Sequence, residues 1–131
     1  MTIKNILAIF MLATLVAGSA LAHHSFSAEY DNKKPVKLSG RVTEMKWSNP
    51  HSWIYIDVET NGRTVNWALE TGAANALIRR GWKRTDLPQG TELHVDGWQA
   101  RNGSPTANVS SVTFADGRRL FAGSSLDDKS K

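Results

Sequence analysis

The chain has 131 residues, four histidines, no cysteine and a formal net charge of +4. This length suits one compact domain, and the lack of cysteine excludes disulfides, thiolate metal ligands and a thiol nucleophile. The basic residues are scattered in short clusters instead of being interleaved with aromatic residues along one segment, so we expect no nucleic-acid partner.

The first 22 residues have the pattern of a secretory signal peptide. Lys4 supplies the positive charge, residues 6–16 form the apolar run, and Ala20-Leu21-Ala22 is a small-residue cleavage site. We predict that residues 1–22 are removed on export to the periplasm, so that the mature chain begins at His23. The apolar run is shorter than the roughly 20 residues that cross a bilayer, so we expect no stable membrane insertion after cleavage. Retention of the uncleaved segment as an anchor is the alternative.

Alternating apolar residues and turn residues predict a β-rich domain over residues 36–122, preceded by an N-terminal arm at 23–35 and followed by a disordered tail at 123–131. Asn61-Gly62 is a strong hairpin signal because both residues tolerate positive φ. The apolar parity changes within the first strand, which contains Gly40, and this predicts a bulge or sharp bend. The predicted strands cover residues 36–47, 52–60, 63–70, 92–100 and 107–114, with a short sixth strand possible at 118–121.

One segment has helical spacing instead. Ala73, Ala74, Leu77 and Ile78 make an apolar stripe over 73–80, with Thr71-Gly72 as the expected cap and Gly81 as the expected end. The resulting order, three strands, a helix and two strands, is that of an OB-fold. The sequence therefore predicts an all-β domain with one inserted helix, folded as an OB-fold-like five-stranded Greek-key barrel. An SH3-like barrel and a small open α+β sheet remain alternatives.

Several motifs together resemble a family of small exported bacterial proteins of unknown function. They are the His23-His24-Ser25-Phe26 start and Trp47-Ser48-Asn49-Pro50-His51-Ser52-Trp53, together with Asn66-Trp67-Ala68, the segment 77–82 and the segment 116–123. The resemblance implies export and an OB-like fold. It implies no biochemical role.

The histidines suggest a metal site. Cleavage before His23 would place its α-amine and ring beside the imidazole of His24, and His51 lies in the loop between the first two predicted strands. Nitrogen donors of this kind suit Cu(II), which also has the highest affinity among the first-row divalent metals. We therefore expect an exported copper-binding protein that uses His23, His24 and His51. The alternative is that no metal site exists, with a flexible mature N-terminus and a His51 that hydrogen-bonds within its own turn.

The aromatic residues suggest a second function. Trp47 and Trp53 flank His51, and Trp53 shares the outer face of its strand with Tyr55. These three could bind an organic ligand or a protein partner, whereas Trp67, Trp82 and Trp98 are expected to fill and seal the core. His94 alternates outward with Glu92 and Asp96 and is a weaker metal candidate. No nucleophile elbow, phosphate loop or H-E-x-x-H motif occurs, so a binding protein is favoured over an enzyme.

Overall fold

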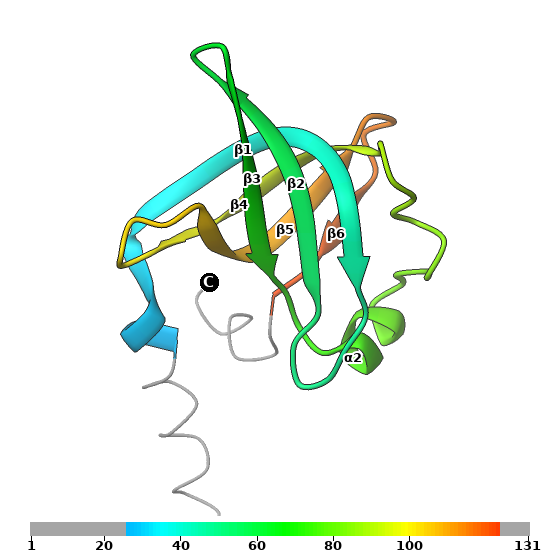
Figure 1. The fold of residues 1–131 in the computed structure, drawn as a ribbon. Helices are drawn as coiled ribbons and strands as arrows, with labels where there is room; N and C mark the ends of the chain where they lie inside the picture. The colour runs from blue at the N-terminus through cyan, green and yellow to red at the C-terminus, as the bar shows by residue number, and fades with distance from the viewer. Residues whose placement is uncertain (1–25, 124–131) are drawn as a thin grey trace, which may run out of the picture.

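The computed structural model describes residues 26–123, and within that range it contains six strands, a short helix and a helical turn at residues 26–29. The elements follow the predicted order. They are β1 (Tyr30–Lys46), β2 (Trp53–Thr60), β3 (Arg63–Glu70), α2 (Ala74–Arg79), β4 (Glu92–Ala100), β5 (Thr106–Phe114) and β6 (Arg119–Phe121). The domain is therefore mainly antiparallel β-sheet with one inserted helix. The segment predicted as a possible sixth strand forms β6 (Figure 1).

The strands pair in the order β3-β2-β1-β4-β5-β6, and β3 also pairs with β5. The pairing of β3 with β5 is parallel, at Ala68 to Glu70, and the other pairings are antiparallel. Figure 1 shows β1 as a long, strongly curved strand, and in the sheet it lies between β2 and β4. Its first half pairs with β4 and its second half with β2, so one strand joins both sides of the sheet.

β1 begins at Tyr30, whereas the sequence predicted a strand only from residue 36. The sequence did not indicate a strand at residues 31–34 because this polar run has no alternation of apolar residues. Tyr30 nonetheless pairs with Ala100, and the register shifts before Pro35 pairs with Trp98. The first six residues of β1 are thus an irregular extension of the strand that reaches the end of β4.

The parity change inside β1 comes from a bulge. The register with β2 shifts between Val42 and Glu44, which moves the inward-facing side chains to the opposite parity, as the sequence predicted. Gly40 has a separate role. A Cβ built on it would lie 2.4 Å from the Asp57 carbonyl oxygen, so this position needs glycine for close backbone approach.

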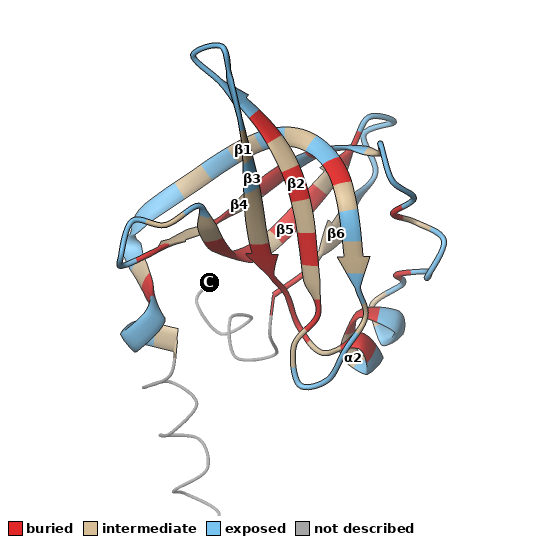
Figure 2. Ribbon diagram, in the orientation of Figure 1, coloured by how far each residue is buried: buried red, intermediate tan, exposed pale blue. Residues whose placement is uncertain are grey.

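The core lies between the inner faces of the strands and is closed at one end by α2 and the residues after it. Ile54, Ile56 and Leu69 are fully buried, and so is Leu77 of α2 (Figure 2). Trp82 is 2 % exposed, and its indole N–H donates to the Phe121 carbonyl at 2.9 Å. The expectation that Trp82 belongs to the core is confirmed.

α2 occupies the predicted place between β3 and β4, but its start differs from the prediction. The N-cap is Ala73, which makes no side-chain cap, so Thr71-Gly72 does not cap this helix. The Thr71 hydroxyl donates instead to the carbonyl of Ser52, at 3.1 Å. Gly81 has φ of 96°, the left-handed conformation expected of a residue that ends a helix.

Candidate functional site

His51 lies in a tightly bonded loop between β1 and β2. The Ser52 hydroxyl donates to the Ser48 carbonyl at 3.1 Å, and the Ser48 amide donates back to that hydroxyl at 3.2 Å. Two backbone bonds tie the same loop to the end of β3, from the Ser52 amide to the Gly72 carbonyl and from the Thr71 amide to the Ser52 carbonyl. The backbone on each side of His51 is therefore held by neighbouring elements.

The ring of His51 is paired with a buried carboxylate. Its Nδ1 lies 3.1 Å from Glu70 Oε1 and 3.3 Å from the Thr71 carbonyl oxygen. The side chain of Glu70 is 10 % exposed, whereas that of His51 is 43 % exposed. A carbonyl and a carboxylate only accept hydrogen bonds, so Nδ1 carries the hydrogen. In the neutral ring, Nε2 then keeps a free lone pair.

Tyr30 completes a chain of three side chains. Its buried hydroxyl donates to the second carboxylate oxygen of Glu70, Oε2. Burial and this bond to Glu70 raise the pKa of Tyr30 well above its ordinary value of 10.0, because both disfavour the phenolate. Glu70 thereby links the first residue of β1 to the loop that follows the last residue of the same strand. The curvature of β1 brings these two ends together.

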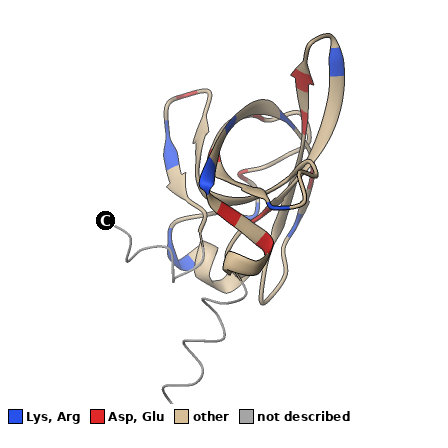
Figure 3. Cartoon of the chain, turned by 90° about the vertical axis from the view of Figure 1, so that its left-hand side faces the viewer, with Lys and Arg blue, Asp and Glu red and all other residues tan. Residues whose placement is uncertain are grey.

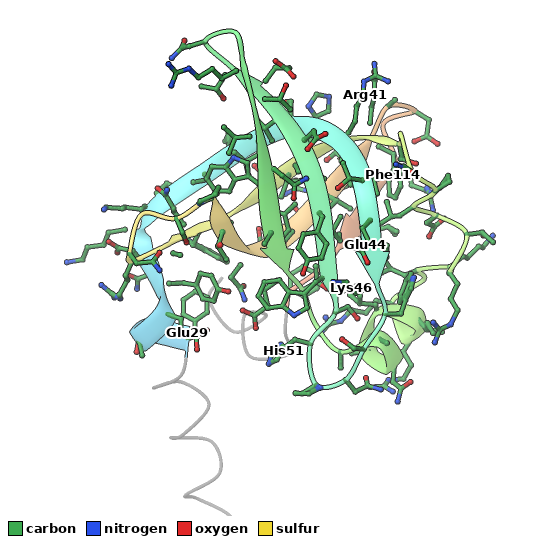
Figure 4. The ribbon with its side chains drawn as sticks, viewed as in Figure 1. Glu29, Arg41, Glu44, Lys46, His51 and Phe114 are labelled. Carbon is green, nitrogen blue, oxygen red and sulfur yellow. The ribbon has the colours of Figure 1, made fainter. Side chains whose placement is uncertain are left out.

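The residues before Tyr30 are fixed to the same region. Residues 26–29 form a helical turn, and the ring of Phe26 packs against Tyr30 and, edge to face, against Trp98. Arg101 holds the turn through two bonds, from its amide to the Glu29 carbonyl and from its Nε to the Ser27 carbonyl. Figure 4 places Glu29 and His51 toward the lower end of the molecule, away from Arg41.

His23 and His24, with the predicted signal peptide of residues 1–22, lie outside the described residues. The predicted tail is described only at Gly123. Between residues 26 and 123 there is no group of three or more histidine, cysteine, aspartate or glutamate side chains that could hold a metal. His51 and Glu70 are a pair within that range, so a metal site here needs a donor from elsewhere. No helix in residues 26–123 is long and apolar enough to cross a membrane.

The three predicted ligand-binding aromatic residues lie in different surroundings. Trp47 packs against the core and meets Trp82 edge to face, with centroids 6.4 Å apart. Tyr55 lies beneath Lys46, whose Nζ is 4.9 Å from the ring centroid. Trp53 instead lines a cavity of about 410 Å³ together with Tyr30 and residues of the β4–β5 turn. Of the three, Trp53 is therefore the one that lines this cavity.

A second cavity, of about 460 Å³, lies near the bend of β1. Its lining includes Arg41, Glu92 and His94, and His94 Nδ1 lies 2.8 Å from the Ser39 hydroxyl. His94 faces outward with Glu92, as the strand alternation predicted. Figure 3 shows positions of both signs of charge distributed along the ribbon.

Tyr30 and Glu70 were not among the residues singled out from the sequence. Tyr30 stood in a polar segment assigned to the arm, and Glu70 looked like an ordinary outward residue at a strand end. A signal for Glu70 was present, because the Asn61-Gly62 turn fixes the hairpin register and sets Trp53 opposite Glu70. That register places the carboxylate of Glu70 on the strand beside Trp53, which lies two positions after His51.

The described part of the chain is thus a small β-rich domain with a histidine–glutamate–tyrosine cluster at one end. The chain belongs to a family of unknown function, DUF6152, whose match covers residues 11–109 and so includes His23, His24, His51 and Glu70. This supports the resemblance to a family of unknown function drawn from the motifs. Comparison with curated proteins and with solved structures gives no match.

Proposed function

We propose that this protein is an exported, periplasmic copper-binding protein that is not an enzyme. Its Cu(II) ligands are the α-amine and ring of His23, the ring of His24 and Nε2 of His51. The observation that carries the proposal is the contact between His51 Nδ1 and Glu70. Metal-ligating histidines commonly donate their second ring nitrogen to a carboxylate or backbone carbonyl, and His51 has both at hand.

The position of Phe26 supports the participation of the mature N-terminus. Phe26 packs on Tyr30, and Tyr30 bonds the same carboxylate that contacts His51. His24 and His23 precede Phe26 by only two and three residues, and a chain advances about 3.3–3.6 Å per residue at most. The anchored start of the domain therefore keeps the mature N-terminus within about 10 Å of the Phe26 backbone.

The scaffold in this proposal is an OB-type barrel. Five pairings support it, because β1–β2–β3 continue through the parallel β3–β5 pairing to β5, then β4, and return to β1. The inserted helix between β3 and β4 also suits that fold. In an OB-fold, the loop between the first two strands is a common binding position, and this is the loop that carries His51.

The test is Cu(II) titration of protein exported by cells, with its first residue established by intact mass. We expect one Cu(II) per chain and a mature start at His23. One alanine inserted before His23 should weaken binding strongly, because the α-amine leaves its chelate position. His51→Ala should also weaken it, while His94→Ala, a histidine on a different strand face, should have little effect.

Equal affinity in the native and extended forms would contradict the proposal and leave adventitious histidine binding only. Another mature start would contradict the N-terminal part of the site directly.

A second function is favoured by the cavity beside Trp53. Its aromatic wall and the neighbouring polar side chains of Asn102, Ser104 and Thr106 suit an organic ligand. Native mass spectrometry of protein taken from the cell envelope would detect such a molecule. A bound organic mass that disappears in Trp53→Ala and persists in His51→Ala would favour this function over copper binding.

A further inference from the structure

The contacts of Glu70 divide between two parts of the candidate site. Oε1 lies 3.1 Å from His51 Nδ1, and Oε2 accepts the hydrogen bond of the Tyr30 hydroxyl. Both carboxylate oxygens are therefore already engaged, and the side chain is nearly buried. A direct metal bond from Glu70 would have to displace one of these partners.

We propose that Glu70 and Tyr30 are positioning residues of the copper site. Glu70, together with the Thr71 carbonyl, favours the hydrogen on Nδ1 of His51 and so leaves Nε2 free for the metal. Tyr30 holds the carboxylate in place and carries the anchored segment that leads to the mature N-terminus. This inference rests on the proposed function and adds two residues to it, neither of which bonds the metal.

The chemistry of the amide explains why Glu70→Gln is the informative change. Glutamine has nearly the same shape as glutamate, but it can present an N–H₂ donor to His51 in place of an acceptor. A donor at this place opposes the Thr71 carbonyl, which still accepts from Nδ1, and so weakens the preference for the tautomer that leaves Nε2 free. Loss of a partner that orients a metal ligand typically lowers metal affinity about 10- to 100-fold.

The experiment is a double-mutant cycle on the exported protein. Cu(II) affinity is measured by competition with a chelator of known strength, and nitrogen ligation is measured by electron paramagnetic resonance. We expect Glu70→Gln to lower the affinity about 10- to 100-fold and to weaken the signal of one imidazole nitrogen in the spectrum. In a His51→Ala background, the same substitution should change the affinity less than about twofold, because Glu70 acts through His51.

Glu44→Gln is the matched control. Glu44 also lies toward the end of β1 and its carboxylate is 3.7 Å from Lys46 Nζ, but its side chain is 55 % exposed. Glu44→Gln removes the same charge as Glu70→Gln and should leave both the Cu(II) affinity and the electron paramagnetic resonance spectrum unchanged. Near-ultraviolet circular dichroism of each variant establishes that the tertiary fold is retained.

Tyr30→Phe tests the second residue and also serves if Glu70→Gln fails to fold. It keeps the ring that packs on Phe26 and removes only the hydroxyl that holds Glu70. We expect a several-fold loss of Cu(II) affinity that vanishes in the His51→Ala background.

The outcomes separate this inference from the proposed function. If His51→Ala leaves Cu(II) binding unchanged, the proposed function itself is wrong. If His51→Ala weakens binding while Glu70→Gln and Tyr30→Phe do not, only the positioning roles are wrong. An equal loss from Glu70→Gln with and without His51 would also overturn the inference, since Glu70 would then act independently.

Discussion

The hydroxyl of Tyr30 offers a direct measure of how strongly the start of β1 is held to β3. Tyr30→Phe keeps the buried ring and removes one hydrogen bond to the carboxylate of Glu70. Hydrogen bonds to charged groups contribute about 1.5–3 kcal/mol to the free energy of unfolding. A loss of about 2 kcal/mol in a domain of this size lowers the melting temperature by roughly 8–16 °C.

The pH dependence gives this prediction a second signature. The pKa of Tyr30 is raised in the folded protein, so the native state keeps a proton that the unfolded state releases near pH 10. The contribution of Tyr30 is therefore fully present below about pH 10 and decreases as the pH rises above it. Tyr30→Phe lacks this titration. The difference in the free energy of unfolding between the native protein and Tyr30→Phe should therefore be constant up to about pH 10 and become smaller above it.

Urea unfolding of both proteins from pH 7 to pH 11 measures both effects. Tyr55→Phe is the control, since Tyr55 lies on the half-buried outer face of β2 and makes no side-chain hydrogen bond within residues 26–123. A difference below about 0.5 kcal/mol between Tyr30→Phe and the native protein would refute the reasoning, as that is the range of ordinary surface substitutions.

Three further predictions concern the scaffold. Gly40→Ala should destabilise the domain by about 1–3 kcal/mol in chemical denaturation, because its Cβ would lie 2.4 Å from the Asp57 carbonyl oxygen. A neutral effect would disprove this close approach. Trp82→Ala should cost about 3–5 kcal/mol, since it empties a buried site and leaves the Phe121 carbonyl without its donor; a loss below about 1 kcal/mol in the same assay would be inconsistent with that burial. The buried Oδ1 of Asn108 has no hydrogen-bond partner within residues 26–123. Asn108→Leu should therefore leave the melting temperature, measured by calorimetry, unchanged or raise it. A marked decrease would reveal a partner for that oxygen.

Local patterns predicted the strands and the helix because each is specified by short-range chemistry. The Asn61-Gly62 turn fixes the β2–β3 hairpin, and Gly81 ends α2 as expected. The start of β1 was not predictable in the same way, since Tyr30 is held by Ala100 and Glu70, which lie far away in the sequence. Alternation within a segment carries no information about such partners.

In the candidate site, too, some features could be predicted from local sequence and others depend on residues far apart in the chain. His51 stood out because of its residue type and its position in a loop, whereas its relation to Glu70 required the hairpin register. The contact of Tyr30 with Glu70 required the curvature of the whole of β1, which depends on strands that pair from both sides. Side-chain chemistry is local in the sequence, and the assembly of a site from strand ends is not.

The path of β1 has a consequence for the order of events during folding. The β2–β3 hairpin joins residues close in sequence and can form early, whereas the Tyr30–Glu70 bond spans 40 positions and the Tyr30–Ala100 pairing spans still more. Contacts between distant residues carry a larger entropic cost of loop closure and slow folding. We therefore expect the cluster around Glu70 to assemble late, when these long-range pairings close, and to be absent from a partly folded chain. A ligand that depends on this cluster would distinguish completely folded molecules from those that are still folding.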